Sequence, residues 1–520
     1  MMRNSEQCLR GKIAKRREVE KESLCNLPMD ILSKILSRLP INEAVRTSVL
    51  SRKWKYVWCG HTNLTLNRGT MRKPYDKTLV GYQWRLLRDK EFITRVDTVL
   101  HQHSGMGVQR MEIKFGLHSK HACHIDRWVN FAIASKTKEF VVDLSGQDKG
   151  SFFTDLSEGT RIISEPPYNL PSQFFSPNYG SYLRCLELTT VSLQLPADFK
   201  GFLNLKSLSL VDMSITDEDV RCMLSKCNLL EFLEISYCRT VTSIRTPYPL
   251  DRLKHLVVDI CPVLDEIDLN CSPTTLKYSG DMVPLKFAST SRLTNISILL
   301  FTRQYALSYM VTGFLGTLSR LETLTLLCKE CERTILPGGP FKFTYLRNLR
   351  LELVFSGHEN IRNTDVLDYA YLLKIAPFME TLELSMWMNC RHQPYHEEDG
   401  ELRIIDPPHQ HTHLRSVRIS GFFGHRDQVE LALHILRSSV VLEKMVITPK
   451  LEISNGVTLS DCFYEEEHYV DGHRVAAESV CNADHRNVVT VERVVPSCWE
   501  TGDKTTKAIK ERALKRRRAK

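Results

Sequence analysis

The chain has 520 residues, of which 42% are hydrophobic and 25% are charged, and its formal net charge is +9. This composition is typical of globular proteins, and the length exceeds what one compact core accommodates, so we expect several units or an array of repeats. No apolar run reaches the roughly 18 residues of a transmembrane helix and the N-terminus has no apolar h-region, so we predict neither a membrane span nor a secretory signal.

The net charge is concentrated at the C-terminal end. Residues 504–520 contain nine Lys or Arg and one acid, Glu511, which sum to +8 and leave +1 for the rest of the chain. We therefore expect a disordered basic tail there and a flexible basic N-terminus over residues 1–23. A near-neutral body disfavours nucleic acid as a partner, whereas the tail and Lys15-Arg16-Arg17 are compatible with nuclear import. We expect the protein in the nucleus, the cytoplasm or both, with its 16 cysteines reduced and mostly buried.

The first predicted element is a group of three short helices in residues 24–60. Residues 30–38 carry apolar side chains at helical spacing, between Pro28 in the first turn and Pro40, which ends the helix. A second helix is predicted over residues 42–50, and Ser51 is expected to cap a third that carries Trp54 and Trp58. A segment of this length cannot bury its Leu, Ile and Trp side chains by itself. We therefore expect it to dock on another protein.

These residues resemble an F-box, in the plant form that ends in LSxxWxxxW. The F-box is the helical segment that binds the Skp-type adaptor of SCF ubiquitin ligases, so the resemblance implies binding to that adaptor and, through it, to a cullin. A helical hairpin that caps the next domain is the alternative interpretation. The adaptor-binding residues that the resemblance implies are Leu27, Pro28, Ile31, Leu32, Ile35, Leu36, Leu39, Trp54 and Trp58.

A linker with a bridging helix over residues 91–101 is predicted for residues 61–107, and a short repeated pattern follows. The pattern is apolar-x-x-apolar-x-apolar, and from Leu183 to Leu253 its starts are 22, 25 and 23 residues apart, a spacing typical of leucine-rich repeats. Its occurrences end at Ile113, Val142, Leu188, Leu210, Ile235, Val258, Leu269, Ile298, Leu326, Leu351, Leu384, Ile419 and Ile447.

The pattern predicts a solenoid of parallel strands over residues 108–412. The second and third apolar positions alternate with polar ones, so they point from a short strand into one core. Helices or irregular segments should cover the other side of each coil. Helices are predicted over residues 125–134, after Thr216 as a cap, from residue 364 or 365 to 376, and from Asp427 with Glu430 at capping-box spacing. The fold class is therefore α/β, with strands on a concave face and helices on a convex one; an ordinary α/β domain is the alternative.

The last repeats, residues 413–450, are similar to the FBD region that ends many plant F-box/LRR proteins. The similarity rests on residues such as Gly421, Phe422, Gly424 and Glu443. It implies no biochemical activity. Two stretches depart from the family: a polar insertion over about residues 145–182 where a repeat is expected, and a C-terminal extension over residues 451–503.

No catalytic, cofactor-binding or metal-binding site is predicted. Cys328 and Cys331 form a lone CxxC without the second pair that a zinc site needs. Two histidine-rich stretches, His118 to His124 with Cys123 and His409 to His413, are interpreted as solvated loops because no acid lies beside them in the sequence. The acidic runs 397–399 and 465–467 are likewise interpreted as solvated loops, and no P-loop, GxGxxG, GxSxG or HExxH is present.

The residues and the resemblance together predict a non-catalytic substrate receptor of an SCF-type ubiquitin ligase. Exposed side chains of the strands would bind an unknown target protein, and the membrane is not a partner. Alternatives are a non-proteolytic F-box/LRR scaffold and a nuclear nucleic-acid-associated protein that uses the basic tail. The target-binding candidates, taken from positions between the buried leucines, are Arg184, Glu187, Lys206, Ser209, Glu231 and Glu234.

Overall fold

The computed structural model describes residues 27–50, 52, 54–71, 89–145, 166–246, 248–300, 306, 309, 310, 314, 320–329, 342–356, 365–404, 410–451 and 466–493. Ser51, Cys331, the basic tail and residues 1–23 lie outside this set. The chain divides into two compact units, Met1–Leu253 with Cys261–Asn270, and Lys254–Ile260 with Cys271–Lys520. No helix in the described ranges combines the length and the hydropathy needed to cross a bilayer.

The first unit begins with the N-terminal helical segment, residues 27–60. It contains α2 (Met29–Leu36), α3 (Ile41–Arg46) and the 3-10 helices η1 (Thr47–Val49) and η2 (Trp54–Gly60). Pro28 precedes α2 as its N-cap residue, and Pro40 precedes α3 in the same way. The predicted helices are therefore present, but the second one tightens to a 3-10 turn after Arg46 and the tryptophans lie on a 3-10 helix instead of an α-helix.

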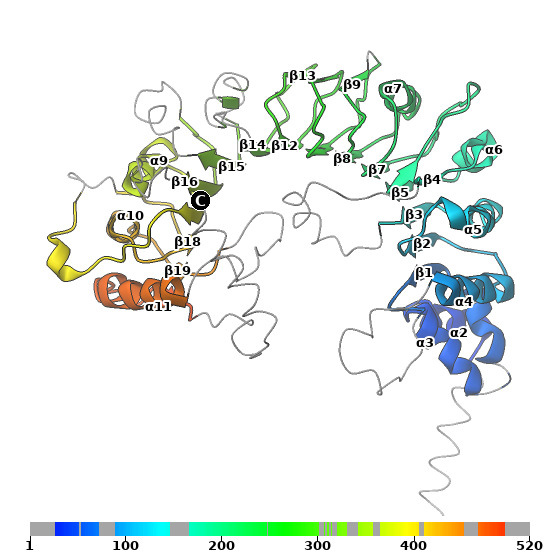
Figure 1. Cartoon of the computed structure of the whole chain (residues 1–520), viewed down its shortest axis with the longest axis horizontal. Coiled ribbons are helices and arrows are strands. Elements are labelled where there is room, and N and C mark those ends of the chain that lie inside the picture. The colour runs from blue at the N-terminus through cyan, green and yellow to red at the C-terminus, as the bar shows by residue number, and fades with distance from the viewer. Residues whose placement is uncertain are drawn as a thin grey trace, which may run out of the picture. The chain divides into compact units, whose positions relative to one another are not determined.

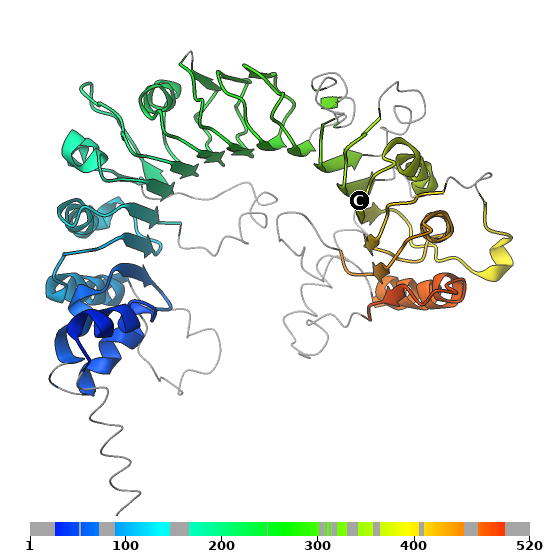
Figure 2. The same ribbon diagram turned by 180° about the vertical axis from the view of Figure 1, so that it is seen from behind.

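The strands of the first unit pair in parallel in the order β1-β2-β3-β5-β7-β8. Helices α4, α5, α6 and α7 all lie on one side of these strands in Figure 1, and Figure 2 shows the same arrangement from behind. The confirmed fold class, α/β with parallel strands, follows from this arrangement. The bounds are β1 Asn63–Asn67, α4 Asp89–Gln102, β2 Arg110–Lys114, η4 Ser119–His121, α5 Ala122–Ala134, β3 Glu139–Asp143, η5 Ser172–Phe175, α6 Pro177–Gly180, β5 Cys185–Thr189, β7 Ser207–Val211, α7 Asp217–Lys226 and β8 Phe232–Ser236.

The repeated pattern is buried as expected, and all but one of its occurrences lie in the main strand series. The second and third apolar residues of each repeat, such as Leu186 and Leu188, lie in a strand and are fully buried. The exception ends at Leu269: it forms β11 (Glu266–Leu269), which pairs with β9 (Ser243–Thr246) outside the main strand series. The next main strand is instead β12 (Thr275–Gly280), with Leu276 and Tyr278 buried. A buried strand has the same alternation of apolar and polar residues in either position. The pattern alone therefore could not show that β11 lies outside the main strand series and β12 within it.

The second unit continues with parallel strands in the order β10-β12-β14-β15-β16-β17-β18-β19-β20. Helices α9, α10 and α11 lie together on one side of the last strands (Figure 1). The remaining bounds are β10 His255–Asp259, β14 Asn295–Leu300, β15 Thr323–Lys329, β16 Asn348–Ser356, η8 Val366–Ala370, α9 Tyr371–Ile375, β17 Thr381–Asn389, η9 Glu397–Asp399, β18 Ser416–Ser420, α10 Arg426–Ser438, β19 Lys444–Thr448, α11 Glu466–Val475, the π-helical η10 Ala476–Cys481 and β20 Val489–Val491; β4 (Tyr168–Asn169) pairs with β6 (Val191–Ser192), and β13 spans Leu285–Phe287.

Three stretches that the pattern left out of the repeats pair with their strands or pack against them. Strand β1 lies in the predicted linker and pairs with β2, and β20 lies in the predicted extension and pairs with β19. Within the predicted insertion, Phe174 and Tyr179 are buried, and Phe174 packs against Phe140 of β3 with ring centroids 5.3 Å apart. These segments carry only short apolar runs, so their place is decided by the neighbouring coil against which they pack.

Helix caps were predicted correctly for α7 but not for α10. Thr216 Oγ1 accepts a hydrogen bond from Asp219 N at 3.2 Å. Helix α10 begins at Arg426, and its capping box joins His425 and Gln428, not Asp427 and Glu430. Glu430 is fully buried and instead forms an ion pair with Arg426 at 3.2 Å. A histidine ring can also accept the capping hydrogen bond, which the usual list of cap residues does not include.

Close backbone approach explains the glycines of the FBD-like stretch. Gly421 follows β18 at φ 68°, and a Cβ there would lie 2.2 Å from Met386 O. Gly472 of α11 lies against the backbone of the residue after Gly421: a Cβ added at Gly472 would lie 2.1 Å from Phe422 O. Helix α11 therefore packs directly on the loop between β18 and α10, which ties the predicted extension to the FBD-like repeat.

We expect Gly472→Ala to loosen α11. In an unobstructed helix Ala is more favourable than Gly by about 1 kcal/mol, but here the new methyl group would overlap a carbonyl, and overpacking costs about 1–3 kcal/mol. Hydrogen exchange of residues 466–481 should become faster in this variant and stay unchanged in Val470→Ala, on the exposed side of the same helix. Unchanged protection in Gly472→Ala would contradict the packing described.

Candidate functional site

The N-terminal helical segment exposes an apolar face. Ile31, Ile35 and Leu39 follow one another at four-residue spacing and are 37%, 42% and 38% exposed. Pro28 is exposed beside them and Leu27 is half-buried. Exposed apolar side chains gathered on one short element are typical of protein-binding surfaces. We call this set, Leu27, Pro28, Ile31, Ile35 and Leu39, the α2 apolar face.

Four of the predicted adaptor-binding residues belong to the core instead. Leu32 and Leu36 are 0% and 1% exposed, and Trp54 and Trp58 are also buried. In the free chain these side chains form the core beneath the exposed face, and their role as adaptor contacts stays a prediction. Helix α2 is apolar on two sides, and periodicity cannot tell which side faces inward.

The same segment exposes four large apolar side chains that its sequence pattern did not single out. Val49 is 88% exposed, and Leu50, Tyr56 and Met29 are also exposed. Val49 and Leu50 lie at the end of η1, where the α-helical geometry of α3 has given way to a 3-10 turn. The only signal in the sequence was the pair of apolar residues directly before Ser51, which a continuous helix would have placed inside.

Two buried histidines connect this segment to the first repeat. His61 Nε2 contacts Leu36 O at 3.1 Å and Leu39 O at 2.9 Å at the end of α2, where Leu36 O also accepts from Leu39 N at 2.9 Å. His103 Nε2 donates in turn to His61 O at 2.8 Å, and Gly105 N donates to His103 Nδ1 at 3.0 Å. These contacts require the neutral Nε2–H form of His103. His103, directly after α4, therefore fixes the position of His61 before β1, and His61 in turn fixes the end of α2.

The second candidate surface is the open face of the first unit's strands, made of the residues between the buried apolar positions. Glu187, Ser209 and Glu234 lie side by side in the register of β5, β7 and β8. Ser209, which we predicted to be exposed, is only 6% exposed because its hydroxyl donates to Glu234 Oε2 at 2.6 Å. Glu187 and Glu234 are half-buried.

The other target-binding candidates lie just before the strands. Arg184 and Lys206 are exposed, and Lys206 Nζ forms an ion pair with Glu231 Oε1 at 2.8 Å. Three of the six candidates therefore form one row across β5, β7 and β8, with a serine between two glutamates, and the other three lie directly before these strands.

Ion pairs cross between neighbouring strands in both units. In the first, Arg110 of β2 contacts Glu139 of β3 and, within its own strand, Glu112, each at 3.0 Å. In the second, Arg347 pairs with Glu380 and Arg350 pairs with Glu383, each at 2.9 Å.

The described cysteines and histidines provide no metal site. Among the residues that the structure describes, no three His, Cys, Asp or Glu side chains are arranged to hold a metal ion. Cys328 is buried in β15, and burial raises the pKa of Cys227 to about 11 and that of Cys271 to about 12, which suppresses their thiolates. His124, however, does have an acid partner: Asp97 of α4, with Nδ1 3.1 Å from its Oδ2. The acid lies 27 residues away in the chain, so sequence proximity did not reveal it.

Comparison with known proteins identifies both parts of the chain. A family model described as the F-box domain matches residues 24–65, and one described as At1g61320/AtMIF1, LRR domain, matches residues 99–495. The Arabidopsis thaliana F-box/FBD/LRR-repeat protein At1g13570 is 27% identical over 82% of this chain and 91% of its own length. F-box/LRR-repeat protein 13 of the same plant is 22% identical over 82% of this chain and 90% of its own.

We expect the attachment of the N-terminal segment to weaken below neutral pH. Burial lowers the pKa of His103 below its ordinary value, and the hydrogen bond to His61 offsets this only in part. The contribution of His103 to stability is therefore complete above about pH 6.5, the unfolded value, and is lost as pH falls towards the lower folded value.

The test compares urea unfolding, followed by tryptophan fluorescence, at pH 7.5 and 5.5. His103→Gln, which keeps a donor and cannot be protonated, should lose less stability on acidification than the wild type. His101→Gln, an exposed histidine of the same helix, should behave as the wild type does. Equal losses in all three proteins would rule out His103 as the titrating group.

Proposed function

The chain belongs to the plant F-box/LRR-repeat proteins, and on this premise we propose that it is the substrate-recognition subunit of an SCF-type E3 ubiquitin ligase. The observation that carries the proposal is the α2 apolar face within the F-box match. Ile31, Ile35 and Leu39 remain exposed, whereas Leu32 and Leu36 of the same segment are buried. A folded segment that keeps such a face exposed is suited to a permanent partner.

In this proposal the F-box binds a Skp-type adaptor, which links the chain to a cullin. The α2 apolar face supplies the anchors, joined by Met29, Val49, Leu50 and Tyr56. Large apolar side chains at the centre of an interface carry most of its binding free energy. The two-histidine connection between α2, β1 and α4 keeps this face fixed relative to the first repeats.

The repeats hold the target in this proposal. The open face of the first unit carries the acidic pair Glu187 and Glu234 together with Arg184 and Lys206. A target held there would be presented to a ubiquitin-conjugating enzyme at high effective concentration. The chain itself would supply binding and orientation, and the bond-forming chemistry would come from its partners, in the nucleus, the cytoplasm or both.

We expect Ile31→Asp/Ile35→Asp to abolish adaptor binding without unfolding the chain. Both side chains are exposed in the free protein, so aspartate is tolerated there, but in the complex each carboxylate would be buried without a partner. Co-expression with a Skp-type adaptor and size-exclusion chromatography should give a stoichiometric complex for the wild type and none for the double variant.

Asp30→Lys is the control, because Asp30 lies exposed on the same helix about 100° around the axis from Ile31 and farther from Ile35. This variant should retain the complex. Leu27→Ala/Pro28→Ala tests the edge of the same face and should weaken it. A complex that survives Ile31→Asp/Ile35→Asp would overturn the adaptor-binding proposal.

We expect Glu187→Lys/Glu234→Lys to release targets while the adaptor stays bound. The reversal places two cations on the open face about two strands apart, so a complementary target meets repulsion. The measurement is the half-life of proteins that co-purify with the wild type and not with the variant. Their stabilisation when the variant replaces the wild type supports a ligase, whereas unchanged half-lives would indicate a scaffold.

A further inference from the structure

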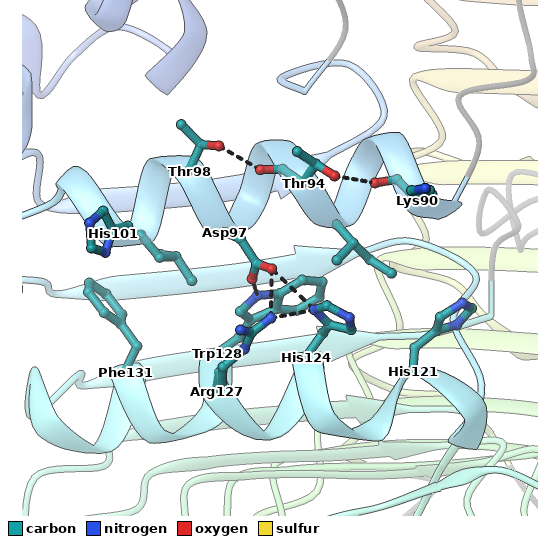
Figure 3. A pocket seen from close by; sticks show the side chains of 12 residues that line it. Lys90, Thr94, Asp97, Thr98, His101, His121, His124, Arg127, Trp128 and Phe131 are labelled. Atoms are coloured by element: carbon teal, nitrogen blue, oxygen red, sulfur yellow. Dashed lines mark hydrogen bonds and ion pairs between the residues drawn. The ribbon is translucent and has the colours of Figure 1, made fainter.

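A groove of about 780 Å³ lies between α4 and α5 of the first unit, and its charged side chains already have partners. Figure 3 shows Asp97 of α4 opposite His124 and Arg127 of α5. Asp97 Oδ2 contacts Arg127 Nη2 at 2.7 Å and His124 Nδ1 at 3.1 Å, and His121 Nε2 lies 3.8 Å from Asp89 Oδ2. The groove therefore has little net charge with which to select a partner.

The turns that lead into β3, β5 and β7 differ from the groove, because they bring cations together in neighbouring repeats. Lys138, Arg184 and Lys206 each lie directly before one of these strands. Arg184 N donates to Lys138 O and Lys206 N donates to Arg184 O, at 2.7 and 2.8 Å, and Glu231 before β8 continues the row. The three cations therefore follow one another at about the 4.8 Å spacing of paired strands.

Two of these cations have no acid partner in the described part of the chain. Lys206 Nζ pairs with the carboxylate that follows in the row, but neither Lys138 nor Arg184 forms an ion pair with any residue that the structure describes. Glu139, the acid beside Lys138 in the sequence, pairs with Arg110 at 3.0 Å. The row thus keeps a surplus of positive charge after its acidic neighbours are counted.

The acids of the open face lie too far along the strands to neutralise this row. Glu187 and Glu234 each follow the row by three residues, which is about 10 Å at 3.3 Å per residue. Glu234 also accepts from Ser209 and Ser236, at 2.6 and 3.3 Å. The turns themselves carry a net charge of +3, from four Lys or Arg and one acid in residues 135–138, 181–184, 203–206 and 227–231.

The same position in the second unit has a balanced row. The residues directly before β15 to β19, aligned by the same kind of backbone hydrogen bond, are Glu322, Arg347, Glu380, Arg415 and Glu443. Acid and base alternate there, and Arg347 pairs with Glu380 at 2.9 Å. Like charges directly opposite one another on neighbouring strands are destabilising. The run of cations in the first unit therefore opposes folding, and a partner that brings negative charge would offset this effect.

Exposed apolar side chains lie in the same turns. Lys136 Nζ lies over the Tyr182 ring, 5.0 Å from its centroid, and Asn204 Nδ2 donates to Ser181 O at 2.6 Å, so the turns before β3, β5 and β7 are neighbours. Tyr182 is 39% exposed and Leu203 is 59% exposed. A partner that reaches these cations can therefore also cover apolar surface. We call Lys136, Lys138, Arg184 and Lys206 the cationic rim.

We propose that the cationic rim binds an acidic segment of the target protein. Carboxylates would contact Lys138 and Arg184, and an apolar side chain of the segment would pack on Tyr182 and Leu203. Charge-assisted hydrogen bonds from lysine and arginine to carboxylates are stronger than neutral ones, and complementary charge selects the partner. The inference rests on the proposed function only in taking this segment to belong to the target.

A partner protein is favoured over the chain's own acidic stretch. Residues 146–165 contain four acids and two bases, so their charge also complements the rim. They follow Ser145, however, which lies beyond the carboxyl end of β3, whereas the rim lies before the amino ends of the strands. The experiments below separate the two occupants.

The probe is a fluorescein-labelled heptapeptide with glutamates on both sides of a central leucine, titrated into the full chain and followed by anisotropy. This peptide should bind with a Kd below about 100 µM, and more weakly as salt is raised. Replacing its glutamates by glutamine should weaken binding about tenfold or more. Equal binding of the glutamine peptide would overturn the proposal.

Arg184→Glu should weaken the glutamate peptide about tenfold or more, because it gives the row the alternating charges of the second unit. For the same reason its urea unfolding midpoint should not fall below that of the wild type. Arg221→Glu is the matched control: it makes the same charge change at an exposed arginine of α7, outside the rim, and should bind as the wild type does. Lys138→Gln, which only removes a charge, should weaken binding in the same direction as Arg184→Glu.

Several results would contradict the proposal. Retained binding in both rim variants would, as would an equal loss in Arg184→Glu and Arg221→Glu, which indicates a general electrostatic effect. Equally tight binding of a single-stranded oligonucleotide of the same charge would indicate a nucleic-acid surface instead. Peptide binding that appears only after deletion of residues 146–165 would assign the rim to the chain itself.

The adaptor complex separates this test from that of the proposed function. All of these variants should retain it, because none of them changes the N-terminal helical segment. Loss of peptide binding with the complex retained reports on the rim alone, whereas a wild type that forms no adaptor complex would contradict the proposed function whatever the peptide does.

Discussion

Everything in this structure depends on the parallel backbone pairing between consecutive coils. A single repeat has two or three leucines on one side of a five-residue strand and cannot bury them alone. Pairing with the strand of the next repeat aligns their apolar positions, as for Leu186 with Leu208 and then Leu233, and turns isolated patches into a continuous core within the unit. The same register places every intervening side chain in rows on the opposite face.

Those rows carry polar and charged side chains that pair across strands. In the second unit, Arg350 and Glu383 lie opposite one another in the strand register and form an ion pair. In the first unit, Arg110 and Glu139 do the same, whereas Glu187 and Glu234 are separated by a serine that donates to one of them. These side chains point away from the leucines, so they can differ between repeats without changing the packing of the core.

The N-terminal helical segment differs from the repeats in that it is folded and yet keeps several apolar residues exposed. Its core is completed by Trp54, Trp58 and the buried face of α2, and His61 Nε2 lies within hydrogen-bond distance of Leu36 O and Leu39 O at the end of α2. His103, directly after α4, donates to His61 O. These two contacts fix the exposed face relative to the first repeat.

The sequence by itself determined the fold class, the resemblance of residues 24–60 to an F-box, the buried positions of nearly every repeat and the cap at Thr216, because each depends on local periodicity or on a short-range hydrogen bond. Only the tertiary structure decided which side of α2 is buried, why Ser209 is not exposed, and that Leu269 belongs to an outer strand while Leu276 belongs to the main one. It also brought Asp97 to His124, placed β1 and β20 beside the repeats and revealed the groove between α4 and α5. These features depend on contacts between residues far apart in the chain, and the alternation of apolar and polar residues is the same whichever neighbour a strand or helix finds.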